Sequence, residues 1–198
     1  HHAETLTGFK WIVRPGFEHP EWRFVMGYEE ALGYSVTPEV ADKDGVTAAL
    51  VMAEMAAAEK ARGRTIVDRL DDLARAHGLH RSAQRSIRFT GASPQADMAA
   101  AMAGLRADPP AAVAGREVAS FVDLLGPDTG WPPTDGIVLR LGPVDRLVVR
   151  PSGTEPKLKI YAESVIAEPL ADLRDAEADL DAVLADLLDR TPGDLGLG

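Results

Sequence analysis

The sequence predicts a chain of two units in the α/β and α+β classes. A partial mixed αβα unit is expected over residues 1–82, followed by an α+β domain over residues 83–198 whose antiparallel sheet packs on helices. Apolar residues repeat at helical spacing from Val46 to Arg62. The pattern changes near residues 80–86, and short strand-like runs separated by glycine and proline follow.

Two helices, a buried strand and one less regular segment are predicted in the first unit. Leu6 to Val13 is apolar and aromatic, which predicts a short strand or turn opening onto a helix. Arg23 to Tyr28 predicts a buried strand. No breaker interrupts the helical repeat from Val46 to Arg62, and Gly63 is suited to end it. A second helix is predicted over Thr65 to Ala76.

The second unit is predicted to have the element order βαββββα. Its strands are expected at Ser86–Phe89, Val113–Leu125, Gly136–Leu141, Arg146–Val149 and Leu158–Ser164. A helix opens at Ser93-Pro94 and closes before Asp108. An acidic amphipathic helix is predicted from Pro169 to Arg190, and the glycine-rich tail after Thr191 is expected to fray.

Composition limits the classes of partner. A net charge of −10 argues against nucleic acid and against an anionic membrane surface, but permits a small anionic substrate held by a few focused cations. The chain has no cysteine, which excludes disulfides and thiolate metal sites. No apolar run approaches membrane-spanning length and no signal-peptide pattern opens the chain, so a cytoplasmic protein is expected. The five histidines have no metal-site spacing, and no metal ligand is predicted.

The string RPSGTEPK lies between the last two predicted strands and suits a phosphate. Arg150 offers a planar fork of charged donors, while Ser152 and Thr154 offer hydroxyl groups. Gly153 lets the backbone turn so that its N–H groups can face an anion, and Lys157 adds a positive charge. The alternative is a tight turn between strands whose arginine is merely solvated.

Three stretches in order resemble the α-D-phosphohexomutase superfamily of phosphoglucomutases and phosphomannomutases. RPSGTEPK is similar to the phosphate-binding loop of its last domain. TLTGFKWI at residues 5–12 resembles another family segment, and GYEEALGY at residues 27–34, followed by DKDG at 42–45, resembles the sugar-binding loop and the start of the next helix. The resemblance covers nearly the whole chain. It implies the C-terminal portion of domain 3 at residues 1–82 and domain 4 at residues 83–198.

The resemblance also implies sugar-binding residues. Glu29 matches the family glutamate that accepts sugar hydroxyls, although an acidic turn in solvent is the alternative. Lys43 precedes a helix N-terminus and is implied to contact a phosphate or a sugar hydroxyl. Thr7 and Gly8 match a loop that contacts the sugar. Ala31 stands where the family has a serine, which leaves the choice among gluco, manno and pentose phosphates open.

In the family, a phosphoserine donates its phosphoryl group to a hexose monophosphate, and the resulting hexose 1,6-bisphosphate reorients and returns the other phosphoryl group. Mg²⁺ held by an aspartate-rich loop assists. Neither the serine loop nor the aspartate loop occurs in these 198 residues, so no catalytic residue is assigned and the chain alone is expected to be inactive. The implied partners are a phosphorylated hexose or pentose and the N-terminal domains of the same protein.

Two other functions stay open at this point. The first is a stand-alone phosphosugar-binding or regulatory module without catalysis. The second is a structural or interaction domain in which RPSGTEPK is only a turn.

Overall fold

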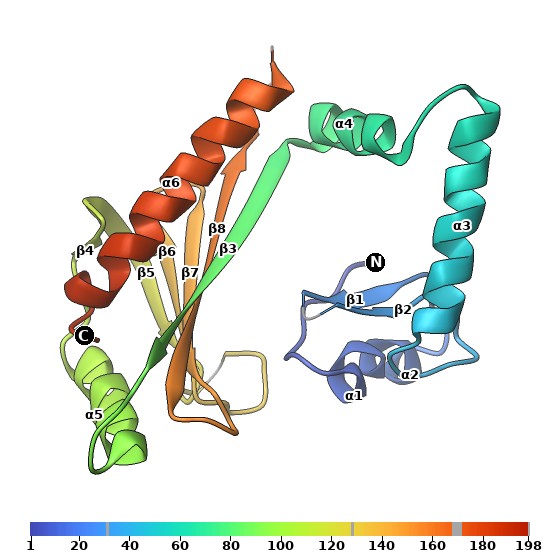
Figure 1. Cartoon of the computed structure of the whole chain (residues 1–198). Coiled ribbons are helices and arrows are strands. Elements are labelled where there is room, and N and C mark those ends of the chain that lie inside the picture. The colour runs from blue at the N-terminus through green and yellow to red at the C-terminus, as the bar shows by residue number, and fades with distance from the viewer. Residues whose placement is uncertain (31, 128, 168–171, 198) are drawn as a thin grey trace. The chain divides into compact units, whose positions relative to one another are not determined.

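The computed structural model describes residues 1–30, 32–127, 129–167 and 172–197. The chain separates into two compact units, His1–Leu70 and Asp71–Gly198 (Figure 1). Helices and an antiparallel sheet packed against the C-terminal helix confirm the predicted fold class. No helix in the described ranges is both long and apolar enough to cross a membrane.

The first unit is a short hairpin flanked by helices. Its first elements are the helices α1 (Phe9–Ile12) and α2 (Arg14–Glu18) and the strands β1 (Gly27–Glu29) and β2 (Gly33–Ser35), which pair antiparallel. The strand predicted from Arg23 to Tyr28 is therefore only partly correct, because it begins at Gly27 and residues 23–26 lie outside it. Val25 and Met26 precede β1 and are 71% and 56% exposed, because a two-stranded hairpin has no neighbouring strand to pair with a longer segment.

The long helix α3 (Gly45–Ala61) confirms the predicted helix. The Asp44 side chain accepts hydrogen bonds from the backbone N–H of Val46 at 2.9 Å and of Thr47 at 3.3 Å, and so caps the N-terminus. Gly63 follows the helix at φ +71°, a conformation that glycine adopts without strain, and this confirms its predicted role as a stop. The next helix, α4 (Ile66–His77), is also as predicted.

The second unit is built on one antiparallel sheet with strand order β3-β8-β7-β6-β5-β4 (Figure 1). Its elements are β3 (Leu79–Arg88), α5 (Pro94–Ala107), β4 (Ala112–Val113), β5 (Arg116–Asp123), β6 (Ile137–Leu141), β7 (Asp145–Pro151), β8 (Lys157–Ile166) and α6 (Leu173–Asp194). Strand β3 starts before the predicted strand at Ser86, because it pairs with β8 along its whole length, from Leu79 opposite Ile166 to Arg88 opposite Lys157.

One face of this sheet packs on helix α6. Along β8 the buried residues alternate, with Leu158, Ile160 and Ala162 at most 1% exposed. They belong to the same buried cluster as Leu184 and Leu187 of α6. The residues between them on β8 therefore lie on the opposite face of the sheet.

The C-terminal tail is anchored, which contradicts the fraying predicted after Thr191. Helix α6 continues through Pro192 to Asp194, and Leu195 and Leu197 beyond it are only 6% and 2% exposed. Burial of these two leucines offsets the backbone freedom of Gly193 and Gly196. The predicted helix start at Pro169 lies outside the described residues, and α6 is described from Leu173 onward.

Candidate functional site

The string RPSGTEPK forms the connection between β7 and β8, two neighbouring strands of the sheet. The Ser152 N–H donates to the Lys157 carbonyl at 2.9 Å, and the Lys157 N–H donates to the Glu155 carbonyl at 2.8 Å. Thr154 is exposed, and its N–H lies 3.5 Å from Ser152 Oγ. The turn thus places the hydroxyl-bearing residues at the end of the sheet with much of their surface open.

Gly153 is exposed in this turn. Its φ lies outside the left-handed region, and a Cβ there would meet no atom within 4 Å. The turn itself does not require glycine at this position. What glycine provides is an open approach to the backbone N–H for an incoming group.

Arg150 is partly buried beside this turn and contacts Tyr161. Its guanidinium donates to the Tyr161 hydroxyl at 3.3 Å and lies 5.6 Å from the centre of the Tyr161 ring. In the part of the chain that the structure describes, no carboxylate pairs with Arg150. The ring and hydroxyl of Tyr161 hold the guanidinium in place, and its charge remains uncompensated.

Lys159 lies directly opposite Arg150 on the neighbouring strand. Like charges directly opposite each other on a sheet face destabilise it, and Lys159 also pairs with no carboxylate among the described residues. An anion bound between the two would offset that repulsion. Sequence reasoning missed Lys159, although the two-residue spacing from Lys157 indicates the same face of a strand.

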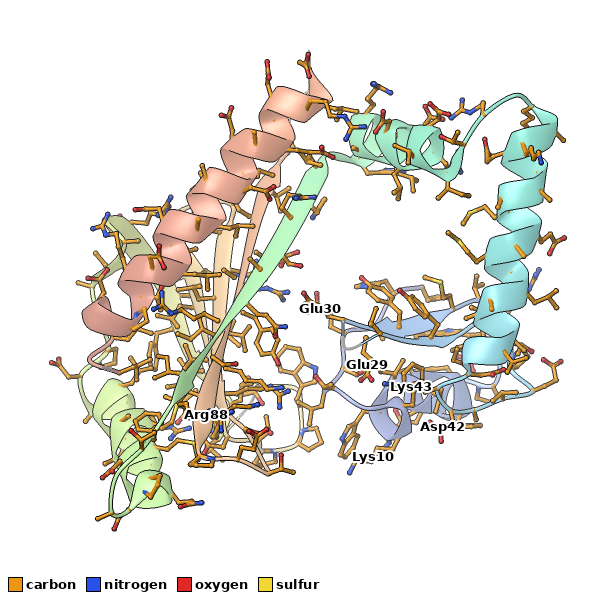
Figure 2. All side chains as sticks on the ribbon, viewed as in Figure 1. Lys10, Glu29, Glu30, Asp42, Lys43 and Arg88 are labelled. Carbon is orange, nitrogen blue, oxygen red and sulfur yellow. The ribbon has the colours of Figure 1, made fainter. Side chains whose placement is uncertain are left out.

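Lys157 has a different environment. Its ammonium group lies 2.8 Å from Glu155 Oε1, and Arg88 Nη2 at the end of β3 lies 3.1 Å from Glu155 Oε2. The hydrogen bond from Lys157, followed by the charges of Lys157 and Arg88, lowers the pKa of the Glu155 carboxyl. Arg88 (Figure 2) was not selected from the sequence because only the register of β3 on β8 brings it opposite Lys157.

In the first unit, the structure brings Gly8, Glu29 and Lys43 together. The Gly8 N–H donates to Glu29 Oε2 at 2.9 Å, and Lys43 Nζ lies 2.6 Å from Glu29 Oε1. The Glu29 side chain is 9% exposed and that of Lys43 is 44% exposed. Figure 2 labels this pair beside the β1–β2 hairpin. Glu29 is therefore a fixed acceptor, which excludes the alternative of a freely solvated acidic turn at this residue.

Gly33 makes this close packing possible. A Cβ at Gly33 would lie 2.5 Å from Lys43 Cε, 2.5 Å from Phe9 Cε2 and 3.0 Å from Glu29 Cγ. Any larger residue would have to displace the ion pair or the phenyl ring, and the sequence interpretation had not selected this glycine. Thr7 precedes Gly8 and is exposed, and Ala31 lies outside the described residues.

The described ranges contain no group of three or more histidine, cysteine, aspartate or glutamate side chains that could hold a metal ion. The two candidate clusters therefore consist of cations, hydroxyl groups and a fixed carboxylate. Such groups recognise anions and hydroxyl-rich ligands.

Comparison with known families gives two matches that lie in order along the chain. Residues 1–76 match the model for the phosphoglucomutase/phosphomannomutase alpha/beta/alpha domain III, and residues 87–180 match that for the C-terminal domain. The domain boundary predicted at residues 82 and 83 lies between the two matches.

Similar proteins agree with these matches. A probable phosphomannomutase of Haemophilus influenzae is 39% identical over 184 residues, which cover 92% of this chain and 34% of that protein. A phosphoglucomutase of Staphylococcus epidermidis is 32% identical over 187 residues, which cover 85% of this chain and 34% of that protein. The chain thus spans about a third of the length of these relatives.

Among solved structures, the open form of the Paramecium phosphoglucomutase pp63/parafusin superposes with a TM-score of 0.57 at 16% identity, over 96% of this chain and 34% of that one. At this identity the likeness concerns the fold alone. Together, the ordered domain matches and the curated relatives show that the chain belongs to the phosphoglucomutase/phosphomannomutase family, from which it carries domain III and C-terminal domain sequence.

Proposed function

We propose that the chain is the substrate-binding portion of a phosphosugar mutase that interconverts hexose 1-phosphate and hexose 6-phosphate through a phosphoserine and a bisphosphorylated sugar. The observation that supports this most is the pair of Arg150 and Lys159 beside the turn of Ser152 to Thr154, which contacts no carboxylate among the described residues. Two facing cations without a carboxylate, next to two hydroxyl groups, suit a phosphate dianion.

In this proposal, Arg150 holds two phosphate oxygens with its planar fork, and the Ser152 and Thr154 hydroxyl groups donate to the phosphate. Gly153 leaves its N–H open to the ligand. Lys157 supplies a further charge from the edge of the turn. These contacts bind and orient one phosphate group while the other reacts.

The sugar is read by the first unit. A carboxylate has about four lone-pair positions, and Glu29 uses one on each oxygen for Gly8 and Lys43. The remaining positions can accept sugar hydroxyls from a group that is already held in place. Lys43, with its more exposed side chain, donates to a phosphate or hydroxyl of the ligand, and the Thr7–Gly8 segment borders the sugar.

Phosphoryl transfer depends largely on positioning and on neutralising charge. The residues of this chain supply both for the phosphate that does not react. Mg²⁺ supports the transfer in the family, but the described residues do not fit a magnesium site, and no step through the metal is assigned to them. The proposal also includes a phosphoserine, Mg²⁺ ligands and a cytoplasmic setting. None of these is assigned to a described residue of this chain.

Binding can be tested by NMR titration of the ¹⁵N-labelled 198-residue chain with glucose 1,6-bisphosphate. The amide resonances of Ser152, Gly153 and Thr154 are expected to shift. Arg150→Ala should weaken binding by about 10- to 100-fold, because it removes hydrogen bonds to a charged group. Arg146→Ala is the matched control, because Arg146 lies on the same strand but pairs with Glu163 at 2.8 Å.

Unshifted loop amides at saturating ligand would contradict the proposed phosphate site. Equal loss of affinity in both arginine variants would mean that net charge, and not the turn, attracts the ligand. The activity part of the proposal is tested separately. The chain alone should show no conversion of glucose 1-phosphate to glucose 6-phosphate in a coupled assay, and measurable turnover would contradict the assignment of catalysis to other domains.

A further inference from the structure

Four cations share one face of the sheet in the second unit. Arg88 lies opposite Lys157 across the β3–β8 pair, and Arg150 lies opposite Lys159 across the β7–β8 pair. Lys157 and Lys159 are two residues apart on β8, so their side chains point to the same side. Strand β8 thus has a cation pair toward each neighbouring strand, on the face opposite the buried Leu158.

The two like-charged pairs differ in how they are compensated. Glu155 contacts both members of the Arg88–Lys157 pair, at 3.1 Å and 2.8 Å. No carboxylate of the described ranges contacts Arg150 or Lys159. The repulsion expected for facing cations is therefore relieved by the chain itself on one side of β8 and left unrelieved on the other.

We propose that Arg88 is a further phosphate-binding residue and that Glu155 is its resident counter-ion, which yields Arg88 and Lys157 to the ligand's phosphate on binding. This inference rests on the proposed function of the same turn. A phosphate dianion carries more charge than a carboxylate and offers three acceptor oxygens. It therefore competes well for a cation pair that only one carboxylate holds.

The exposure of the three side chains allows such an exchange. Arg88 is 62% exposed, Glu155 42% and Lys157 19%. The Arg88–Glu155 ion pair joins two exposed groups and contributes little net stability, so its rupture costs little. Lys157 is the less mobile partner, whereas Arg88 and Glu155 have room to reorient. While no ligand is bound, Glu155 keeps the two cations near the turn. A ligand must then carry more negative charge than one carboxylate in order to displace Glu155.

The test uses the 198-residue chain titrated with glucose 1,6-bisphosphate and, in parallel, with inorganic phosphate. Arg88→Gln should weaken binding and Glu155→Gln should strengthen it, each by about three- to tenfold, the size expected for one partly exposed charge contact. Two control variants remove the same charges elsewhere. The first is Arg85→Gln, because Arg85 lies on β3 and its side chain pairs with Asp189. The second is Glu163→Gln, because Glu163 lies further along β8.

Both control variants should bind within about twofold of the unsubstituted chain, because screening weakens charges more than a Debye length away. The Arg88 Nε–Hε resonance should also shift when phosphate is added. Unchanged affinity in Arg88→Gln, or no gain in affinity in Glu155→Gln, would overturn the inference. The proposed function would still stand if the amide resonances of Ser152 to Thr154 shift with ligand. Absence of any binding to the unsubstituted chain would overturn both.

Discussion

The two candidate clusters achieve charge balance in opposite ways. In the first unit, Glu29 is almost fully covered, and both of its oxygens are already engaged by Gly8 and Lys43. In the second unit, Arg150 and Lys159 face each other, and no carboxylate among the described residues contacts either of them. The first cluster is complete without a ligand and can orient one. The second is electrostatically incomplete and favours an anion.

The scaffolds beneath the clusters also differ. Among the described residues, the first unit buries only two apolar side chains, Phe9 and Val13, whereas apolar residues of α3 such as Val46 and Leu50 are 80% and 69% exposed. The second unit has a continuous core between the sheet and helix α6. The turn of Ser152 to Thr154 is therefore carried by a well-packed sheet, whereas the cluster of Gly8, Glu29 and Lys43 depends on a few close contacts around a hairpin.

The largest expected effect comes from the core of the second unit. Leu187→Ala removes a leucine that is 0% exposed between α6 and the sheet, and it should lower the free energy of unfolding by about 2–5 kcal/mol. Urea denaturation followed by circular dichroism, with amide hydrogen exchange in β7 and β8, measures this. Loss of protection in the first unit instead would contradict the separation of the two scaffolds.

Gly33→Ala tests the close contacts of the first unit. The added methyl group would lie 2.5 Å from both Lys43 Cε and Phe9 Cε2, and such overpacking should cost about 1–3 kcal/mol. Hydrogen exchange of the β1–β2 amides measures the loss. Gly16→Ala is the control, because its Cβ would meet Phe24 at an ordinary 3.5 Å. Equal protection in both variants would mean that the hairpin relaxes freely around the ion pair.

A pair of charge deletions contrasts the clusters directly. Glu29→Gln removes the negative charge of the Lys43–Glu29 ion pair and should destabilise the first unit by about 1–2 kcal/mol. Arg150→Gln removes one member of an unfavourable pair and should leave stability within about 0.5 kcal/mol or raise it slightly. Thermal unfolding of both variants without ligand measures the contrast. If Arg150→Gln destabilised more than Glu29→Gln, the second cluster would have a structural counter-ion.

Part of this arrangement could be predicted from the sequence, and there is a physical reason why the rest could not. Helices α3, α4 and α5 could be predicted from local periodicity, caps and breakers, because these features are visible in the sequence itself. The roles of Arg88, Lys159 and Gly33 depend on strand register or on close contact between segments far apart in sequence, which local patterns do not contain. The strand expected at Arg23 to Tyr28 begins only at Gly27 for the same reason, since apolar content alone does not provide a neighbouring strand.

The smallest expected effect concerns the cap of α3, next to Lys43. The Asp44 pKa lies below its usual 3.8, because Thr47 Oγ1 donates to the carboxylate and the Val46 N–H adds a second hydrogen bond. A depressed folded-state pKa means that the stabilising contribution is fully present above pH 3.8 and is lost as pH falls through the lower folded value. The Val46 and Thr47 amide shifts should therefore titrate below pH 3.8. Asp44→Asn, which can cap without titrating, should remove that step, and a step retained in this variant would assign the transition to another carboxyl group.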